Sequence, residues 1–391
     1  MATTFKTFLN NDIVSTKTLL HEAIPITGSI ASGTYNLDGA TDDTYNGTNI
    51  KNYAHGMIQS VYDYPYLSSS ANHIFDLTVG YSSASALSGA TGHSNPPQAT
   101  PRTMQAKKIN MYNQMAQVLV GYNTLGKILP FDENGNLSEG AGAADRKMKE
   151  CVFISVARLL AKDEIKKGSF TLKIGTGSYA NPFTSDAGLD AIVTVSDSGK
   201  QNDYRVNSPA GEYAILSATV GYNKGAYPGN PPACGLIYYQ AGIIVLTSSL
   251  FMSGTNTSAG RGLLSGAEGR PAFTAEGLSI TASLTGSTIS SSCNYFRNRI
   301  YDMSFNNTTE LNSTIHFCRI NHNDYNYSSN PTYLSSSQIV VKNNPLDAPI
   351  SYFTTVGLYS SDSELLAVAK LSEPLKKDPT NEMTIRVRLD Y

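Results

Sequence analysis

The sequence predicts a mainly β fold of sandwich- or jelly-roll-like sheets, with a few helices in the N-terminal part and an α+β character overall. Charged residues make up only 15% of the 391 residues, against about 25% in a typical globular protein. The chain has 24 Tyr, 32 Gly and no Trp, which is typical of strands joined by polar turns. Alternating apolar and polar runs separated by Gly-, Asn- and Pro-rich turns recur in the second half, as in sheets with one buried face.

The N-terminal part is predicted to start with a short helix. Leu19, Leu20 and Ala23 follow two candidate capping residues and precede Pro25, which would end the helix. Residues 28–49 are rich in Gly, Ser, Thr, Asp and Asn and predict a loop. Residues 72–81 alternate between apolar and polar side chains and predict a strand.

The clearest helix is predicted over residues 106–119, where apolar side chains recur every three or four positions. Gly121 is well placed to end it. Asp132 and Glu133 begin a Gly- and Asn-rich segment, so we interpret them as solvated loop acids. Residues 149–160 fit a helix face and a strand equally well, and both interpretations stay open.

The remaining chain is dominated by predicted strands. They cover residues 170–174, 191–195, 213–219, 236–250 (as two strands around a turn at 240–242), 278–284, 314–318 and 383–390. We therefore divide the chain into three regions. Residues 1–165 form a mixed α/β assembly region, residues 166–290 a β-rich middle domain, and residues 291–391 a C-terminal β region that closes the fold. The middle domain has the composition of an inserted domain.

Composition also bounds the partners. The formal net charge is −2 and the basic pairs are isolated, which argues against nucleic acid and against an anionic membrane. The first ten residues do not resemble a signal peptide and no run of 18 apolar residues occurs, so we expect a soluble chain made in a cytoplasm, without membrane insertion. The four Cys are widely spaced and are interpreted as buried free thiols, although spacing does not exclude a disulfide.

The sequence contains no recognisable catalytic motif. Phosphate-binding loops, the HExxH zinc motif and the G-x-S-x-G nucleophile elbow are all absent. His316 and His322 are the only neighbouring histidines, and we favour surface or hydrogen-bonding roles for them over a metal site. We therefore expect a protein that is not an enzyme, with no catalytic, cofactor-binding or metal-binding residues and no cofactor.

Tyr62, Tyr64 and Tyr66 form the densest aromatic segment of the chain. Aromatic residues contribute much of the binding energy at protein interfaces, which makes these three candidate interface anchors. The alternative is that they pack in the chain's own core, and the sequence does not separate the two.

Two stretches resemble structural proteins of contractile-tailed marine bacteriophages, the cyanophage-like myoviruses. One joins residues 10–22 with the segment VYDYPYLSSSANH at 61–73, and the other runs from FCR at 317–319 through GLY at 357–359 and ELLAVAKL at 364–371 to RVRLDY at 386–391. Together they cover about a third of the chain. The resemblance implies a tail or baseplate component, of the wedge type, whose last strands close a sheet.

The leading hypothesis is thus a virion structural protein, located in the particle and present in multiple copies beside other tail or baseplate proteins. A capsid or neck decoration protein is the nearest alternative. A carbohydrate-binding β-sandwich protein is the alternative from a different class, disfavoured by the lack of Trp. Residues 175–290 carry no resemblance, which is consistent with an outward-facing insertion.

Overall fold

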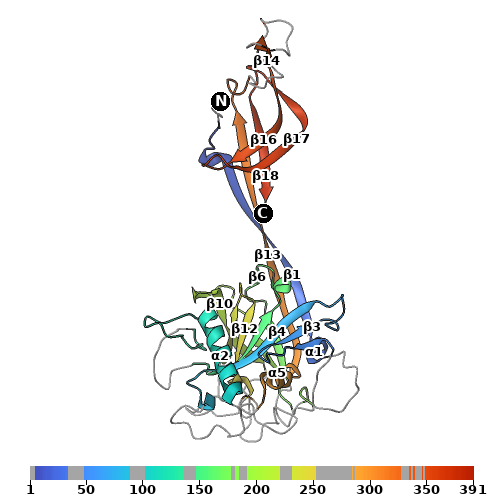
Figure 1. The fold of residues 1–391 in the computed structure, drawn as a ribbon, viewed down its shortest axis with the longest axis vertical. Helices are drawn as coiled ribbons and strands as arrows, with labels where there is room; N and C mark the ends of the chain where they lie inside the picture. The colour runs from blue at the N-terminus through green and yellow to red at the C-terminus, as the bar shows by residue number, and fades with distance from the viewer. Residues whose placement is uncertain are drawn as a thin grey trace. The chain divides into compact units, whose positions relative to one another are not determined.

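A computed structural model describes residues 5–33, 48–88, 102–135, 147–177, 181–184, 192–220, 231–251, 284, 287–326, 334–335, 338–339, 346 and 348–391 (Figure 1). Strands dominate, which confirms the predicted mainly β fold. The described helical segments are η1 (Asn10–Asp12), α1 (Gly28–Ser32), η2 (Ala86–Ser88), α2 (Arg102–Leu119), α3 (Arg158–Ala161), η3 (Ser248–Phe251) and α5 (Ile289–Arg297).

The largest sheet has 14 strands in the order β1-β13-β7-β8-β10-β11-β12-β5-β4-β3-β2, with β6 and β18 also pairing with β13 and β9 with β10. Its strands are β1 (Ile13–Thr27), β2 (Ile50–Asn52), β3 (Gln59–Tyr62), β4 (His73–Tyr81), β5 (Glu150–Val156), β6 (Glu164–Ile165), β7 (Thr171–Gly175), β8 (Ile192–Ser196), β9 (Arg205–Ser208), β10 (Gly211–Val220), β11 (Ala233–Tyr238), β12 (Ile243–Thr247), β13 (Ile300–Ile320) and β18 (Met383–Asp390). The hairpins β14 (Leu334–Ser335) with β15 (Gln338–Ile339), and β16 (Ser351–Tyr359) with β17 (Leu365–Lys377), form separate two-stranded sheets.

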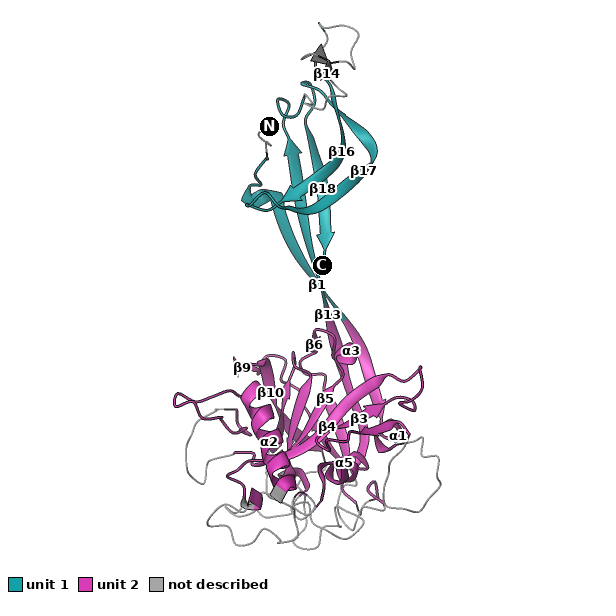
Figure 2. Cartoon of the chain, in the orientation of Figure 1, with its two compact units in different colours: residues 1–20, 310–391 teal, residues 21–309 magenta. Residues whose placement is uncertain are grey.

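The chain forms two compact units (Figure 2). Unit 1 contains residues 1–20 and 310–391, and unit 2 contains residues 21–309. This division differs from the three sequence regions proposed above, because strands from all three share one sheet. β5 pairs with β12 across the proposed boundary at residue 165, and β7 pairs with β13 across the boundary at residue 290.

Unit 2 covers its sheet on both faces. Val152 and Ile154 of β5 point into a core that also contains Cys293 and Phe296 of α5. The intervening Phe153 points into a second core, closed by the apolar face of α2. A strand buried on both faces is apolar at nearly every position, so it loses the two-residue alternation that marks a half-buried strand. This explains why residues 149–160 fitted helix and strand alike.

α2 confirms the helix predicted at residues 106–119 and packs closely on β4. A Cβ atom at Gly80 would lie 2.7 Å from the Lys108 carbonyl oxygen and 2.8 Å from the Tyr112 amide nitrogen. Only glycine allows this approach without a backbone shift. The buried Lys108 amine donates to the carbonyl oxygens of Leu284 and Ser287, at 2.5 Å for Ser287, so α2 is also held to the segment before α5.

The helix predicted to end at Pro25 is wrong, because this segment forms β1. Its Leu and Ala residues have a helical spacing, but pairing with β13 overrides that local preference. β1 ends the strand order of the sheet, and an edge strand tolerates a proline such as Pro25 because one row of its amides needs no partner within the sheet.

The other predicted strands in the described residues are found at or near their expected positions. Residues 236–247 lie in the end of β11, the predicted turn and β12, whereas residues 248–250 belong to η3 and not to a strand. Ile385 and Val387 are the buried side of β18. Residues 278–283 of the predicted strand 278–284 lie outside the described residues. Cys151, Cys234 and Cys293 are buried free thiols as predicted, and Cys318 is half-buried.

Arg297 is the largest fully buried side chain and is expected to be critical for the stability of unit 2. Its guanidinium donates to Gln59 Oε1 at 3.0 Å, the Ala31 carbonyl oxygen at 2.9 Å and Asn294 Oδ1 at 2.8 Å. Arg297→Met keeps much of the volume but leaves these buried acceptors without their donors. We expect the free energy of unfolding to fall by about 2–4 kcal/mol, measured by urea denaturation.

The matched control is the exposed Arg386→Met, which should change the free energy of unfolding by less than about 0.5 kcal/mol. Equal effects of the two substitutions would contradict the structural role of Arg297.

Candidate protein-interaction surfaces

Tyr62, Tyr64 and Tyr66 lie at the end of β3 and in the turn that leads to β4. Tyr62 is half-buried and faces His73 across the strand pair, with 5.4 Å between the ring centroids. Tyr66 packs against Tyr62 with the centroids 6.1 Å apart. Tyr64 is 45% exposed. The structure thus brings two of the three predicted anchors together and turns the third outward.

The turn that carries these rings is held by its own polar groups. The Asn72 backbone amide donates to Asp63 Oδ1 at 2.6 Å, and the Asn72 side chain donates to Asp63 Oδ2 at 2.8 Å. The Ser68 amide donates to the Pro65 carbonyl oxygen at 2.8 Å. These bonds fix the backbone of the turn that carries the three rings.

Residues of β2 and the turn after it complete this group. The Lys51 ammonium lies 4.8 Å from the Tyr53 ring centroid and 6.0 Å from that of Tyr66. Tyr53 stacks on His55 with a centroid distance of 5.2 Å and an interplanar angle of 8°. Lys51, Tyr53 and His55 alternate along the chain, but this local pattern does not indicate that they lie beside Tyr62 and Tyr66. We call the set Lys51, Tyr53, His55, Tyr62, Tyr64, Tyr66 and His73 the aromatic surface.

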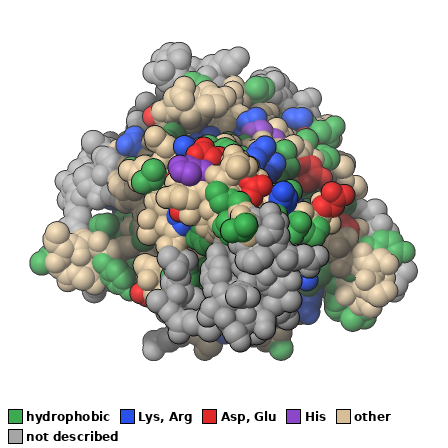
Figure 3. Space-filling view, turned by 90° about the horizontal axis from the view of Figure 1, so that it is seen from above, with side chains coloured by type: hydrophobic (Ala, Val, Ile, Leu, Met, Phe, Trp, Pro, Cys, Tyr) green, Lys and Arg blue, Asp and Glu red, His purple; other side chains and the backbone are tan. Residues whose placement is uncertain are grey.

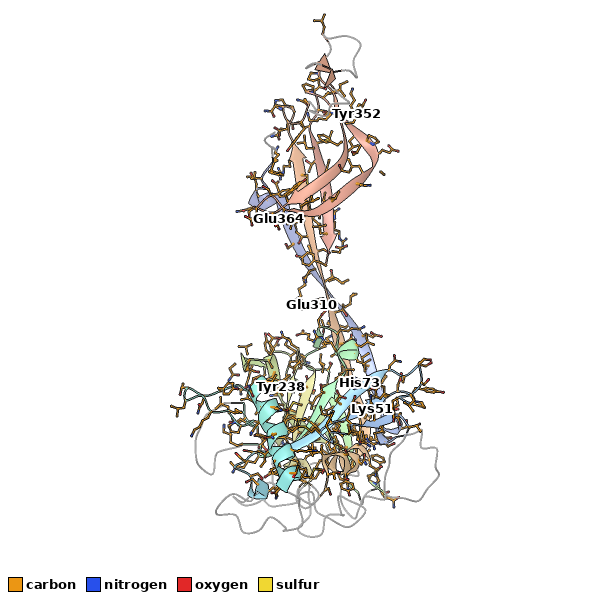
Figure 4. All side chains as sticks on the ribbon, viewed as in Figure 1. Lys51, His73, Tyr238, Glu310, Tyr352 and Glu364 are labelled. Atoms are coloured by element: carbon orange, nitrogen blue, oxygen red, sulfur yellow. The ribbon has the colours of Figure 1, made fainter. Side chains whose placement is uncertain are left out.

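A His–Asp pair borders the aromatic surface (Figure 4 labels His73 and Lys51). His73 Nε2 lies 2.8 Å from Asp76 Oδ1, which also accepts a hydrogen bond from Ser60. The bond to Asp76 raises the pKa of His73, against the opposing effect of burial. Burial by itself would raise the pKa of Asp76, but the hydrogen bonds from His73 and Ser60 outweigh it and lower that pKa.

This trio is not arranged for nucleophilic catalysis. In a Ser–His–Asp triad the imidazole stands between the hydroxyl and the carboxylate and takes the hydroxyl proton. Here Asp76 stands between Ser60 and His73, and Ser60 is buried. The geometry therefore orders the aromatic surface and does not activate Ser60.

The other sequence candidates do not converge on a site. His322 pairs with Glu382 at 3.2 Å, and His316 packs beside Phe8 with the ring centroids 5.3 Å apart. In the described ranges no three His, Cys, Asp or Glu side chains are grouped to hold a metal ion. Asp132 corrects one expectation: it is buried and lies 2.6 Å from Lys147 Nζ, and so it is a structural acid and not a solvated one.

Unit 1 offers a second surface. Its buried cluster consists of Ile320, Leu358, Ile385 and Val387, where one face of the β16–β17 hairpin packs on β13 and β18. The hairpin positions that alternate with this inner side remain open, with Leu366 68% and Val368 56% exposed. The strand pairing is irregular between Leu358 and Tyr359, so the alternation is interrupted there and the consecutive Leu365 and Leu366 are both exposed. Tyr359, Leu365, Leu366, Val368 and Lys370 form what we call the outer hairpin face. In the space-filling view, basic and acidic side chains lie interspersed with hydrophobic ones (Figure 3).

No protein-family model, curated protein or solved structure matches the chain. None of the described helices is both long and apolar enough to cross a membrane. The assignment of function therefore rests on the residues themselves.

The His73–Asp76 pair should make folding stability depend on pH in a defined window. The raised pKa of His73 stabilises the fold below about pH 6.5 and this contribution is lost as pH rises through the folded-state pKa. The lowered pKa of Asp76 stabilises the fold above about pH 3.9 and is lost as pH falls through the folded-state pKa. A double-mutant cycle with His73→Gln and Asp76→Asn should give a coupling of up to about 1 kcal/mol near pH 5.5.

The same cycle at pH 8.5 should give a clearly smaller coupling, because His73 loses its proton as the pH rises through its raised pKa. A coupling that is unchanged between the two pH values would show that charge plays no part in the pair.

Tyr62 and Tyr64 should respond differently to truncation. Tyr62→Ala removes ring contacts to two neighbours and is expected to lower the free energy of unfolding by about 1–2 kcal/mol. Tyr64→Ala, at an outward position, should lower it by less than about 0.5 kcal/mol. Urea denaturation of both variants checks this, and a loss at Tyr64 as large as that at Tyr62 would place Tyr64 in the chain's own packing.

Proposed function

We propose that the chain is a structural protein of a bacteriophage particle, a tail or baseplate component of the wedge type that acts through protein–protein contacts. The observation that carries this proposal is the contrast within unit 1 between a small buried cluster and long strands with exposed apolar side chains. Large exposed apolar patches are rare on soluble monomers, and where they occur they commonly mark interaction sites.

The burial pattern of unit 1 supports this proposal. The four side chains of its buried cluster are each 6–8% exposed, whereas Leu365 is 53% and Leu366 68% exposed on the neighbouring strand. Covering one such side chain is worth about 1.5–3 kcal/mol. A protein that works alone gains nothing from leaving these residues uncovered, whereas an assembly component gains a binding surface.

The sequence resemblance supports the proposal that the particle is that of a tailed bacteriophage. The GLY, ELLAVAKL and RVRLDY segments fall on β16, β17 and β18 respectively. The stretch that resembles phage tail proteins is thus the stretch that builds the exposed hairpin and the sheet beneath it. A capsid or neck decoration protein would also bind through exposed apolar side chains. Fractionation of particles into heads and tails distinguishes that location from a tail or baseplate location.

A carbohydrate-binding role remains a second candidate because of the aromatic surface. Tyr rings beside hydrogen-bonding side chains such as His55 and Asn72 are the groups that sugars contact. A protein partner fits better, because the rings largely contact one another and Lys51 and because no Trp is present.

Mass spectrometry of purified particles and of isolated tails tests the proposal. We expect the chain to be present, to remain with the tail fraction and to have a copy number that fits the rotational symmetry of the tail. Presence in whole particles but not in tails would support a capsid or neck location.

Absence from particles would overturn the virion role. Binding of the purified chain to a glycan array, lost in Tyr64→Ala, would then support the carbohydrate-binding role.

A further inference from the structure

We propose that the outer hairpin face is a self-association surface, through which two copies of the chain pair about a two-fold axis. This inference goes beyond the virion role and does not depend on it, because it rests only on residues of unit 1. Three features carry it: an apolar centre, opposite charges at either side of that centre, and a charge order that matches its own reverse.

The centre of the face is apolar and open. Leu365, Leu366 and Val368 of β17 are 53%, 68% and 56% exposed. Tyr359 of β16 is 46% exposed and packs against Phe5, with 4.8 Å between the ring centroids. Phe5 is itself 42% exposed, so it enlarges the apolar area.

Opposite charges flank this centre. Asp362 and Glu364 lie in the turn just before β17, and Lys370 lies beyond Val368 on the same strand. All three are exposed, and they belong to none of the ion pairs found between the described residues. Farther along, Lys376 is already paired with Asp378 at 3.4 Å, so it is a weaker candidate than Lys370.

These charges are too far apart to satisfy one another within one chain. Glu364 and Lys370 are six positions apart, and an extended strand advances about 3.3 Å per residue, so roughly 20 Å separates their backbone positions. Glu364 and Lys370 therefore do not pair with each other within one chain, and both are open to a second molecule.

A two-fold axis satisfies both charges at once. The midpoint between Glu364 and Lys370 is Ala367, whose side chain packs inward against the buried cluster. An axis at this point places Leu366 of each copy opposite Val368 of the other copy. It also sets Glu364 of each copy near Lys370 of the other. Every contact then occurs twice, which is how an isologous dimer multiplies a modest contact.

The charge order favours a second copy over an unrelated protein. Along the face the order is acidic, apolar, basic. When a second copy runs in the opposite direction, its order is basic, apolar, acidic, so the charges of the two copies are complementary and the apolar centres meet. Figure 4 shows Glu364 and Tyr352 at opposite ends of the hairpin. The proposed contact between the two copies uses the strand residues between these ends. The face is small, so we expect affinity in the micromolar range.

Sedimentation velocity of the full-length chain over a concentration series tests the proposal. The wild-type chain should show a monomer–dimer equilibrium that weakens as salt rises. Glu364→Lys and Lys370→Glu should each raise the dissociation constant about tenfold or more, because each creates two like-charge contacts per dimer. The double substitution restores opposite charges and should return the dissociation constant to near the wild-type value.

Val368→Asp gives an independent check, since it should abolish the dimer without unfolding an exposed position. Leu125→Asp, at a residue of unit 2 that is 77% exposed, is the matched control and should leave the equilibrium unchanged. Circular dichroism confirms that each variant is folded.

A chain that stays monomeric up to about 100 µM overturns the inference, as does a double reversal that dimerises no better than either single one. These outcomes are separate from the virion role, which is tested on particles. A monomeric chain that is found in tails leaves that role intact.

Discussion

The backbone hydrogen bonds of β13 are the constraint on which the rest of the structure depends. This 21-residue strand pairs with β7 at residues 300–304, with β6 at Asn307 and Thr308, and with β18 at residues 313–320. An uninterrupted strand must find partners for its amides and carbonyls along its whole length. Where the partner changes, the buried Asn307 takes part: its side chain donates to the Leu160 carbonyl oxygen at 2.9 Å and accepts from the Glu22 amide at 3.1 Å.

The two units differ in how many faces of their strands are covered. In unit 2 the side chains of β5 enter one core on one face of the sheet and a second core on the other face. The apolar side chains of this strand are therefore buried on both faces. In unit 1 the hairpin covers only one side of β13 and β18, and its own opposite side stays open. Exposed apolar side chains thus remain in unit 1 on the side of the hairpin that no other described element covers.

The pattern of apolar and polar residues predicted those helices and strands that have one buried side and one exposed side. β18 and α2 each have one buried and one exposed side, and alternation or helical spacing reveals such elements. β1 was missed because nearly all of its residues are exposed, so no buried face marks its period. The two compact units differ from the three proposed sequence regions, and local sequence does not show pairings such as that of β5 with β12, which joins distant segments. Tyr62, Tyr64 and Tyr66 were found by composition, but the contribution of Lys51 depends on the pairing of β2 with β3, which local sequence does not show.

The aromatic surface and the outer hairpin face have different physical characters, and that difference bears on how the chain would assemble. The rings of the aromatic surface are held by Asp63, Asp76 and Lys51, so binding there would cost little ordering entropy and would favour a specific, shaped partner. The outer hairpin face is apolar at its centre, with Leu, Val and Tyr side chains, and its charges lie apart, which suits a copy of itself. An assembly needs both kinds of contact, because an isologous contact alone closes on two copies and a second, unlike surface is required to connect such pairs to anything else.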